Sequence, residues 1–314
     1  PGTQTNPPRR RSLGVSLRRR VLRQGGPVER SENPGVGARQ LAAELAGPQA
    51  PVLLDASLIL HRPEFDGDYR TDSGRHLWQS GHLPGAIHVE VDADFAVSAP
   101  THNQHPPAQV LAERAARFGI GPDTPTVVYD STGGFWAARV WYLLRWIGVP
   151  VRVLDGGLAA WSAAGLPTDA GSTQPVPVPP WRVRAIRDAW IELDELREID
   201  SSAANLVCAL SPAAFTGAEP TRYHRRGHIP GSRNVAARSL LDQRGLLLPP
   251  TEITALYRDA GADLDREVLL YCGGGISATV NALALVAAGI ERLRVYDGSL
   301  EEWSADPSLP LTVG

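Results

Sequence analysis

The chain contains the same pattern twice. Three segments recur in the same order: GHLPGAIHVEVD at 81–92 with GHIPGSRNVAAR at 227–238, TVVYDSTGGFWAARVWYLLRWIGV at 126–149 with EVLLYCGGGISATVNALALVAAGI at 267–290, and VLDGGLAAW at 153–161 with VYDGSLEEW at 295–303. The first pair is 146 residues apart (227 minus 81) and the last is 142 apart (295 minus 153). This period exceeds that of solenoid repeats, so the sequence predicts two copies of one domain.

Proline separates the two copies. Residues 167–183 include the run TQPVPVPP, where missing amide hydrogens forbid a regular ladder and favour a stiff, extended linker. We therefore expect a first domain at 37–166 and a second at 184–314. Residues 1–36 differ from the rest, because seven arginines precede the first acidic residue. We expect a disordered leader there, with a transit peptide or an anion-binding arm as alternatives.

Composition excludes several functional classes. The chain is 43% hydrophobic and 21% charged, with a net charge of -3, which is typical of a globular protein and does not point to nucleic acid. No uninterrupted apolar stretch reaches the length of a membrane span, so we expect no membrane partner. Two cysteines cannot make a disulfide framework, and we therefore expect a reducing, cytoplasmic location.

Short apolar runs alternate with helical patterns in each copy. Residues 51–57, 126–130 and 151–157 are rich in β-branched residues, and residues 135–148 carry apolar residues at helical spacing up to a glycine. This alternation predicts an α/β fold with a mostly parallel sheet covered by helices on both faces. Ligands of such sheets bind beyond the carboxyl ends of the strands, where Asp130 and Cys272 are expected.

The segment YCGGGISAT at 271–279 combines one of the two cysteines with three glycines. The glycines of such a loop approach a ligand closely, and its amide hydrogens, at the start of a helix, stabilise an anionic sulfur. The thiol pKa is then lowered and Cys272 becomes a nucleophile, although unpaired cysteines are often small buried hydrophobes. That second reading fits Cys208, which lies inside an apolar run without a glycine loop.

Other chemistries of a glycine-rich loop fit poorly. A Walker phosphate loop ends in Gly-Lys-Ser/Thr, and this chain has no lysine. The stretch GGGISA at 273–278 matches the dinucleotide fingerprint only loosely. A cysteine phosphatase needs an arginine six residues after its nucleophile, and Ala278 stands there.

Together these motifs resemble the rhodanese family, and within it the two-domain sulfurtransferases acting on thiosulfate or 3-mercaptopyruvate. The matching segments extend from about residue 40 to residue 311. The resemblance implies two domains, each with a sheet of about five strands flanked by helices, of which the first is the inactive copy with Asp130 in place of the nucleophile. It implies that Cys272 carries sulfur as a persulfide without a metal or an organic cofactor. It also implies a persulfide cradle formed by the amides of Gly273, Gly274, Gly275, Ile276, Ser277 and Ala278.

The chain departs from the family pattern around the donor. Gly274 replaces the serine of mercaptopyruvate-type loops, and no basic residue follows Cys272 as in thiosulfate-type loops. Leu210 and Ala214 replace two expected arginines, whereas Arg222 lies near the place of a substrate-binding arginine. Arg225 and Arg226 are further candidates for positive charge, or members of a solvated basic turn.

The first copy is expected to add an acid and a histidine to the cleft. Asp92 matches the acid, and the histidine is His102 or His105, of which we favour His105 because it precedes prolines. His82 and His228, in the two GH-(L/I)-PG turns, are expected to be structural.

Three hypotheses follow. The first is a sulfurtransferase that moves sulfur from thiosulfate or 3-mercaptopyruvate through Cys272 to cyanide or a thiol, with a thioredoxin-like reductant as a partner. The second, motivated by Leu210 and Ala214, is a rhodanese-like binding protein or sulfur and redox sensor with weakened catalysis. The third is that Cys208 resolves the persulfide through a disulfide with Cys272.

Overall fold

The computed structural model describes residues 33–98, 100–199 and 204–314. Most of the predicted leader, up to residue 32, lies outside the described residues. Within these ranges no helix is long and apolar enough to cross a bilayer.

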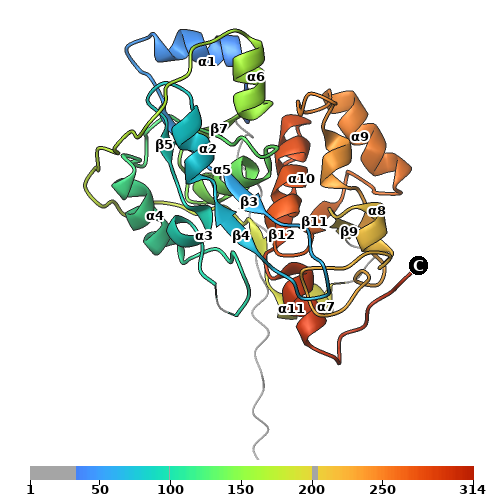
Figure 1. The fold of residues 1–314 in the computed structure, drawn as a ribbon. Helices are drawn as coiled ribbons and strands as arrows, with labels where there is room; N and C mark the ends of the chain where they lie inside the picture. Colours follow the sequence, from blue (N-terminus) through green and yellow to red (C-terminus); the bar gives the residue numbers. More distant parts are fainter. Residues whose placement is uncertain (1–32, 99, 200–203) are drawn as a thin grey trace, which may run out of the picture. The chain divides into compact units, whose positions relative to one another are not determined.

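The first copy forms a five-stranded parallel sheet (Figure 1). The strand order is β1 (Gly35–Val36), β7 (Val151–Leu154), β6 (Thr126–Tyr129), β2 (Val52–Asp55) and β5 (Ile87–His88). Helices α1 (Ala38–Leu45) and α6 (Gly157–Ala163) pack on one face, and α4 (Ala108–Arg117) and α5 (Phe135–Trp146) on the other. The edge strand β1 begins two residues before the predicted domain start at residue 37.

The second copy repeats this sheet. Its strand order is β10 (Arg233–Asn234), β9 (Ala204–Cys208), β11 (Glu267–Tyr271), β12 (Leu293–Tyr296) and β8 (Trp190–Ile191), again all parallel. Helices α7 (Leu193–Glu198) and α11 (Ser299–Ala305) pack on one face, and α9 (Pro250–Asp259) and α10 (Ile276–Ala287) on the other. The predicted α/β fold, with two sheets of five strands flanked by helices, is therefore confirmed.

Shorter elements complete the described chain. They are the antiparallel pair β3 (Leu58–Leu60) and β4 (Thr71–Ser73), the helices α2 (Arg75–Ser80), α3 (Val91–Asp94) and α8 (Pro212–Phe215), and a 3-10 turn, η1 (Ala237–Leu240).

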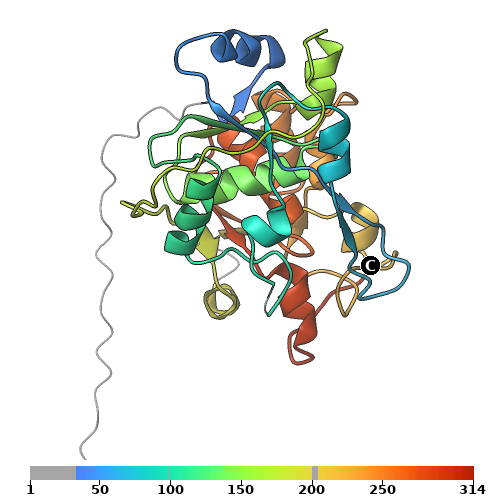
Figure 2. The same cartoon turned by 60° about the vertical axis from the view of Figure 1, so that its left-hand side comes forward.

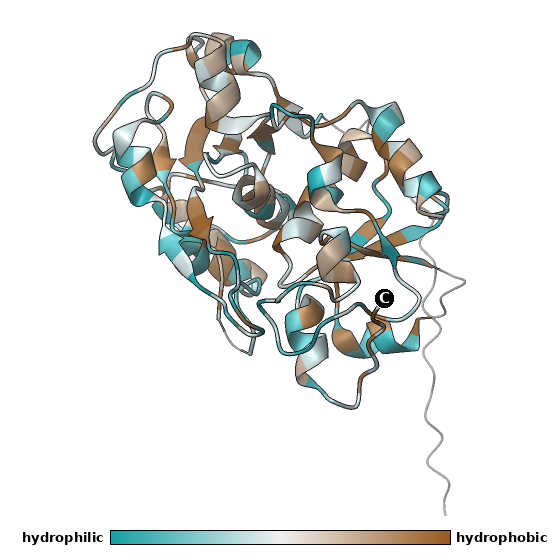
Figure 3. Cartoon of the chain, turned by 45° about the vertical axis from the view of Figure 1, so that its right-hand side comes forward, coloured by the Kyte–Doolittle hydropathy of each residue, from teal (hydrophilic) through white to brown (hydrophobic). Residues whose placement is uncertain are grey.

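One hydrophobic core joins the two copies. Alternate residues of a central strand face opposite sides of its sheet, so that Val127 packs toward α1 and α6 while Val128 packs toward α5. The core on the α5 side continues across α10 to the second sheet, where Leu270 belongs to it. Helices α5 and α10 lie next to each other in both views of the fold (Figures 1 and 2), and hydrophobic residues line the strands on either side (Figure 3).

This position explains why α5 and α10 lack a polar face. Ten of the 12 residues of each helix are buried, because each packs against its own sheet and against the other helix. One of these buried residues is charged: Arg139, a fully buried arginine in the middle of α5. A buried charge is tolerated when it is paired and hydrogen-bonded.

The partner of Arg139 belongs to the other copy. Its guanidinium donates to both carboxylate oxygens of Asp297, at 2.6 and 3.2 Å, and to the carbonyl of Asn103. The ring of Trp190 lies 5.2 Å from the guanidinium carbon. The pair therefore links helix α5 of the first copy to the turn between β12 and α11 of the second.

We expect Arg139→Met to lower the free energy of unfolding by about 3 to 5 kcal/mol, because it leaves the Asp297 carboxylate buried without its cation. Urea unfolding followed by circular dichroism measures the change. The matched control is Arg184→Met, which breaks an exposed pair with Asp123 at 3.4 Å and should cost less than about 1 kcal/mol. Equal effects of the two substitutions would contradict the assigned role of the buried pair.

Candidate active site

Cys272 follows β11 directly and opens the loop that leads into α10. Its side chain is only 2% exposed. The loop is attached to the first turn of α11, since Leu300 N–H donates to the Cys272 carbonyl at 3.1 Å and Glu301 N–H to the Gly273 carbonyl at 2.8 Å. The carboxyl ends of β11 and β12 thus meet at this loop, as the sequence predicted for a parallel sheet.

Ser299, which no sequence motif predicted, binds the backbone of the cysteine loop. Its hydroxyl oxygen accepts the N–H groups of Cys272 and Gly275, each at 3.1 Å, and its own hydrogen goes to the Tyr296 carbonyl at 2.8 Å. Gly275 was predicted to belong to the persulfide cradle, but its amide is directed to Ser299 instead. The repeat could have revealed this residue, because the second copy has Ser299 where the first copy has Gly157.

The corresponding loop of the first copy holds the carboxyl group of Asp130. The carboxylate of Asp130 accepts the N–H groups of Thr132 and Gly134, each at 2.8 Å, and of Ala137 at 2.9 Å. Burial raises the pKa of Asp130, while these hydrogen bonds act in the opposite direction. A loop of this type, at the start of a buried helix, therefore surrounds an acidic side chain with backbone donors.

Glycine at position 275 is required by the ion pair between the copies. The residue has a φ of +77°, and a Cβ there would lie 2.6 Å from Asp297 Oδ1 and 3.3 Å from Arg139 Nη1. The Asp297 carboxylate also accepts the N–H of His105 at 2.7 Å. Arg139 and Asp297, neither of which the sequence analysis singled out, thus form the back wall of the cysteine loop.

His102, the alternative histidine, lies against the loop. Its Nδ1 and its backbone N–H contact Glu301 Oε1 at 2.5 and 3.1 Å, and its ring stacks on Tyr69 with centroids 4.0 Å apart. The other oxygen of Glu301 would lie 3.2 Å from a Cβ at Gly274. The carboxylate of Glu301 therefore lies against Gly274, the position that holds a serine in mercaptopyruvate-type loops.

The favoured histidine, His105, has a different environment. Its ring stacks on Trp190, with centroids 4.5 Å apart, and meets the edge of Trp146. It therefore takes part in the aromatic packing between the copies, and it reaches the cysteine loop through its backbone contact with Asp297.

Asp92, the predicted acid, lies near Tyr69. Burial raises the pKa of Tyr69, and the carboxylates of Asp92 and Glu301 raise it further, against a hydrogen bond from Asn103 and the charge of Arg222. Asp92, Glu301 and Arg222 therefore all lie within electrostatic range of the Tyr69 hydroxyl.

The three arginines of the basic turn are all engaged. Arg222 donates to the carbonyl of His61 in the first copy, at 3.0 and 2.5 Å, and burial lowers its pKa. Arg225 donates to four carbonyls of the segment 303–309, and Arg226 pairs with Asp66 at 2.9 Å. All three arginines thus have protein partners, and the Arg226 side chain is 39% exposed.

The two cysteines face opposite sides of the second sheet. Cys208 pairs in register with Tyr271 and packs with it toward α7 and α11, whereas Cys272 belongs to the central core. Burial raises the pKa of Cys208 to about 12. A disulfide between the two sulfurs would require one side chain to cross the sheet, so the geometry argues against Cys208 as a resolving residue.

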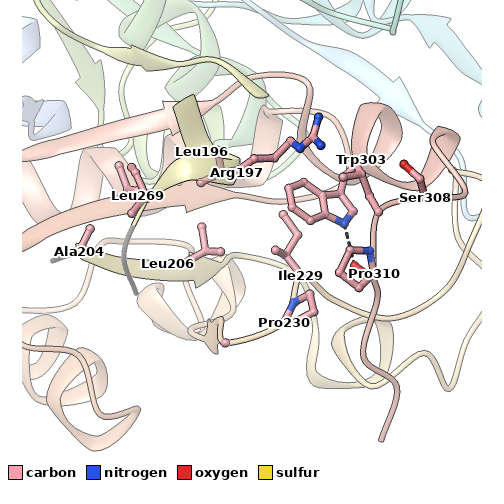
Figure 4. Close-up of a pocket in the computed structure, with 13 residues that line it drawn as sticks. Leu196, Arg197, Ala204, Leu206, Ile229, Pro230, Leu269, Trp303, Ser308 and Pro310 are labelled. Carbon is pink, nitrogen blue, oxygen red and sulfur yellow. Dashed lines mark hydrogen bonds between the residues drawn. The ribbon is translucent and has the colours of Figure 1, made fainter. Parts of the chain in front are cut away.

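A separate cavity of about 400 Å³ lies on the α7 and α11 side of the same sheet (Figure 4). Trp303 and the Ile229-Pro230-Gly231 turn form part of its wall. The first copy has a cavity in the equivalent place, lined in part by Trp161, Pro84 and Gly85. Because the repeat produces both cavities and neither is lined by Cys272, we regard them as features of the fold.

Comparison with known proteins agrees with this geometry. A family model described as a rhodanese-like domain matches residues 38–164 and 216–306. Human 3-mercaptopyruvate sulfurtransferase is 33% identical over 282 residues, which cover 85% of this chain and 91% of the human protein. The 3-mercaptopyruvate sulfurtransferase of Escherichia coli K12 is 31% identical over 280 residues, 88% of this chain and 96% of its own.

Among solved structures, the Tum1 protein of Saccharomyces cerevisiae superimposes with a TM-score of 0.76 over 88% of this chain and 97% of its own, at 21% identity. It shows the same fold. The chain therefore belongs to the rhodanese family and is a sulfurtransferase of its two-domain type.

Proposed function

We propose that the protein transfers the sulfur of 3-mercaptopyruvate through a persulfide on Cys272 to a thiol acceptor. The observation that supports this most strongly is the equivalent loop of the first copy, in which three backbone amides donate to the carboxylate of Asp130. Cys272 occupies the same place after the equivalent strand. An anionic sulfur there is expected to be held by the amides of Gly273, Gly274, Ile276, Ser277 and Ala278.

The chemistry is a double displacement. The Cys272 thiolate attacks the sulfur of 3-mercaptopyruvate, the new S–S bond forms as the C–S bond breaks, and the electron pair leaves with pyruvate as its enolate, which takes up a proton. An acceptor thiolate then attacks the outer sulfur, becomes a persulfide and releases the Cys272 thiolate.

The acceptor is proposed to be a small thiol or a thioredoxin-like reductant, with cyanide as a substitute in the test tube. Cys208 and Cys272 are both free. Unpaired cysteines and a persulfide intermediate suit a reducing compartment, and we therefore place the reaction in the cytoplasm.

A second candidate is a binding or sensing protein with weak turnover. Leu210 packs against the hydrophobic cores and Ala214 is buried, so the residues at these two positions provide no cation for a donor. Incubation with 3-mercaptopyruvate followed by mass spectrometry distinguishes the two. One added sulfur that a thiol acceptor removes supports the transferase, and a stable adduct that no acceptor removes supports the sensor.

We expect Cys272→Ser to reduce sulfur transfer from 3-mercaptopyruvate to background, because a hydroxyl does not form a persulfide. Cys208→Ala is the matched control and should retain most of the activity, since Cys208 faces the other side of the sheet. Both variants are assayed for pyruvate release after circular dichroism has shown that they are folded. Transfer by Cys272→Ser would rule out the proposed function.

We expect Gly275→Ala to impair transfer more than tenfold, because its Cβ would push against Asp297 and displace the loop. Gly289→Ala provides the control, since Gly289 also has a positive φ, of +83°, but nothing lies within 4 Å of its added Cβ. Both substitutions should cost about 1 to 2 kcal/mol from the left-handed backbone alone. If the two variants have the same activity, the contact with Asp297 is not what shapes the loop.

A further inference from the structure

Glu301 occupies an unusual place for an acidic side chain. Its backbone N–H is bound to the Gly273 carbonyl at 2.8 Å, so the residue is held beside the cysteine loop. One carboxylate oxygen is bound by His102, and the other points at Gly274, two residues from Cys272. The Glu301 side chain is only 13% exposed, so its carboxylate lies against the loop and is largely shielded from water.

The arginines near the loop are bound to groups other than the Glu301 carboxylate. Arg139 is bound to Asp297 on the inner side of the loop. Arg222 is bound to the His61 carbonyl, and Arg226 to Asp66. Asp92 adds a second carboxylate, whose charge acts on the Tyr69 hydroxyl as that of Glu301 does.

We propose that Glu301 is a specificity-determining residue, which excludes dianionic donors such as thiosulfate and leaves donors with a single negative charge, such as 3-mercaptopyruvate. This inference rests on the proposed function of Cys272. A charge close to the reacting sulfur repels a donor in proportion to the donor's own charge, and the repulsion is strong where water is partly excluded. His102 holds the carboxylate in this position.

The repeat supports a role specific to the active copy. Ala159 and Ala160 stand in the first copy where Glu301 and Glu302 stand in the second. Glu302 faces elsewhere, because its carboxylate accepts the hydroxyl of Tyr296 at 2.7 Å. Comparing variants of Glu301 and Glu302 therefore distinguishes an effect at the loop from a general effect of charge on α11.

The test compares donors in Glu301→Gln and in the control Glu302→Gln, with cyanide as acceptor. We expect Glu301→Gln to raise the ratio of kcat/KM for thiosulfate to kcat/KM for 3-mercaptopyruvate by about tenfold or more, and Glu302→Gln to leave it within about twofold. A merely structural role of Glu301 would change both donors alike and leave the ratio unchanged. That outcome, or an equal rise in the control, overturns the proposal.

A second measurement does not depend on turnover. Cys272 is alkylated with neutral iodoacetamide and with anionic iodoacetate in the Cys208→Ala background, and the two rates are compared. We expect Glu301→Gln to raise the rate with iodoacetate relative to iodoacetamide by several-fold, even if no donor is turned over. Absence of sulfur transfer would then contradict the proposed function alone, whereas an unchanged ratio of alkylation rates would contradict the role of Glu301.

Discussion

The ion pair between Arg139 and Asp297 is the interaction on which the active region depends. It joins a helix of one copy to a turn of the other inside the shared core, where an unpaired charge would be very costly. The planar guanidinium matches the carboxylate with two hydrogen bonds and has a further donor for the Asn103 carbonyl, which lysine could not do with the same geometry. One pair thus positions the back of the cysteine loop and the segment that carries His102.

The two copies show how one loop design serves two purposes. In the first copy Asp130 binds the loop amides itself, and the site is closed by its own side chain. In the second copy Cys272 stands at the place of Asp130, and the hydroxyl of Ser299 accepts the N–H groups of Cys272 and Gly275. The first copy contributes to the surroundings of the cysteine loop in the second, because Arg139 binds Asp297 and His102 binds Glu301.

Much of this architecture could be read from the sequence. The repeat, the alternation of strands and helices, and the glycines after Cys272 predicted both sheets and the place of the reactive loop. Three finer features were not predicted from the sequence: the amide of Gly275 is bound to Ser299, His102 contacts Glu301 beside the loop, and the arginines of the basic turn are bound to other parts of the chain. Each of these depends on a partner at least 24 residues away in the chain, and local patterns carry no record of such pairings.

The sequence by itself determined the number of copies, the fold of each and the position of the glycine loop after Cys272, because periodicity and glycine act over a few neighbouring residues. Only the tertiary structure decided that the copies share a core, that Arg139 meets Asp297, and that Glu301 covers the loop beside Cys272. The physical reason is that charge and hydrogen bonding act through space. Residues as far apart as His102 and Glu301 become neighbours only when the two sheets pack around α5 and α10.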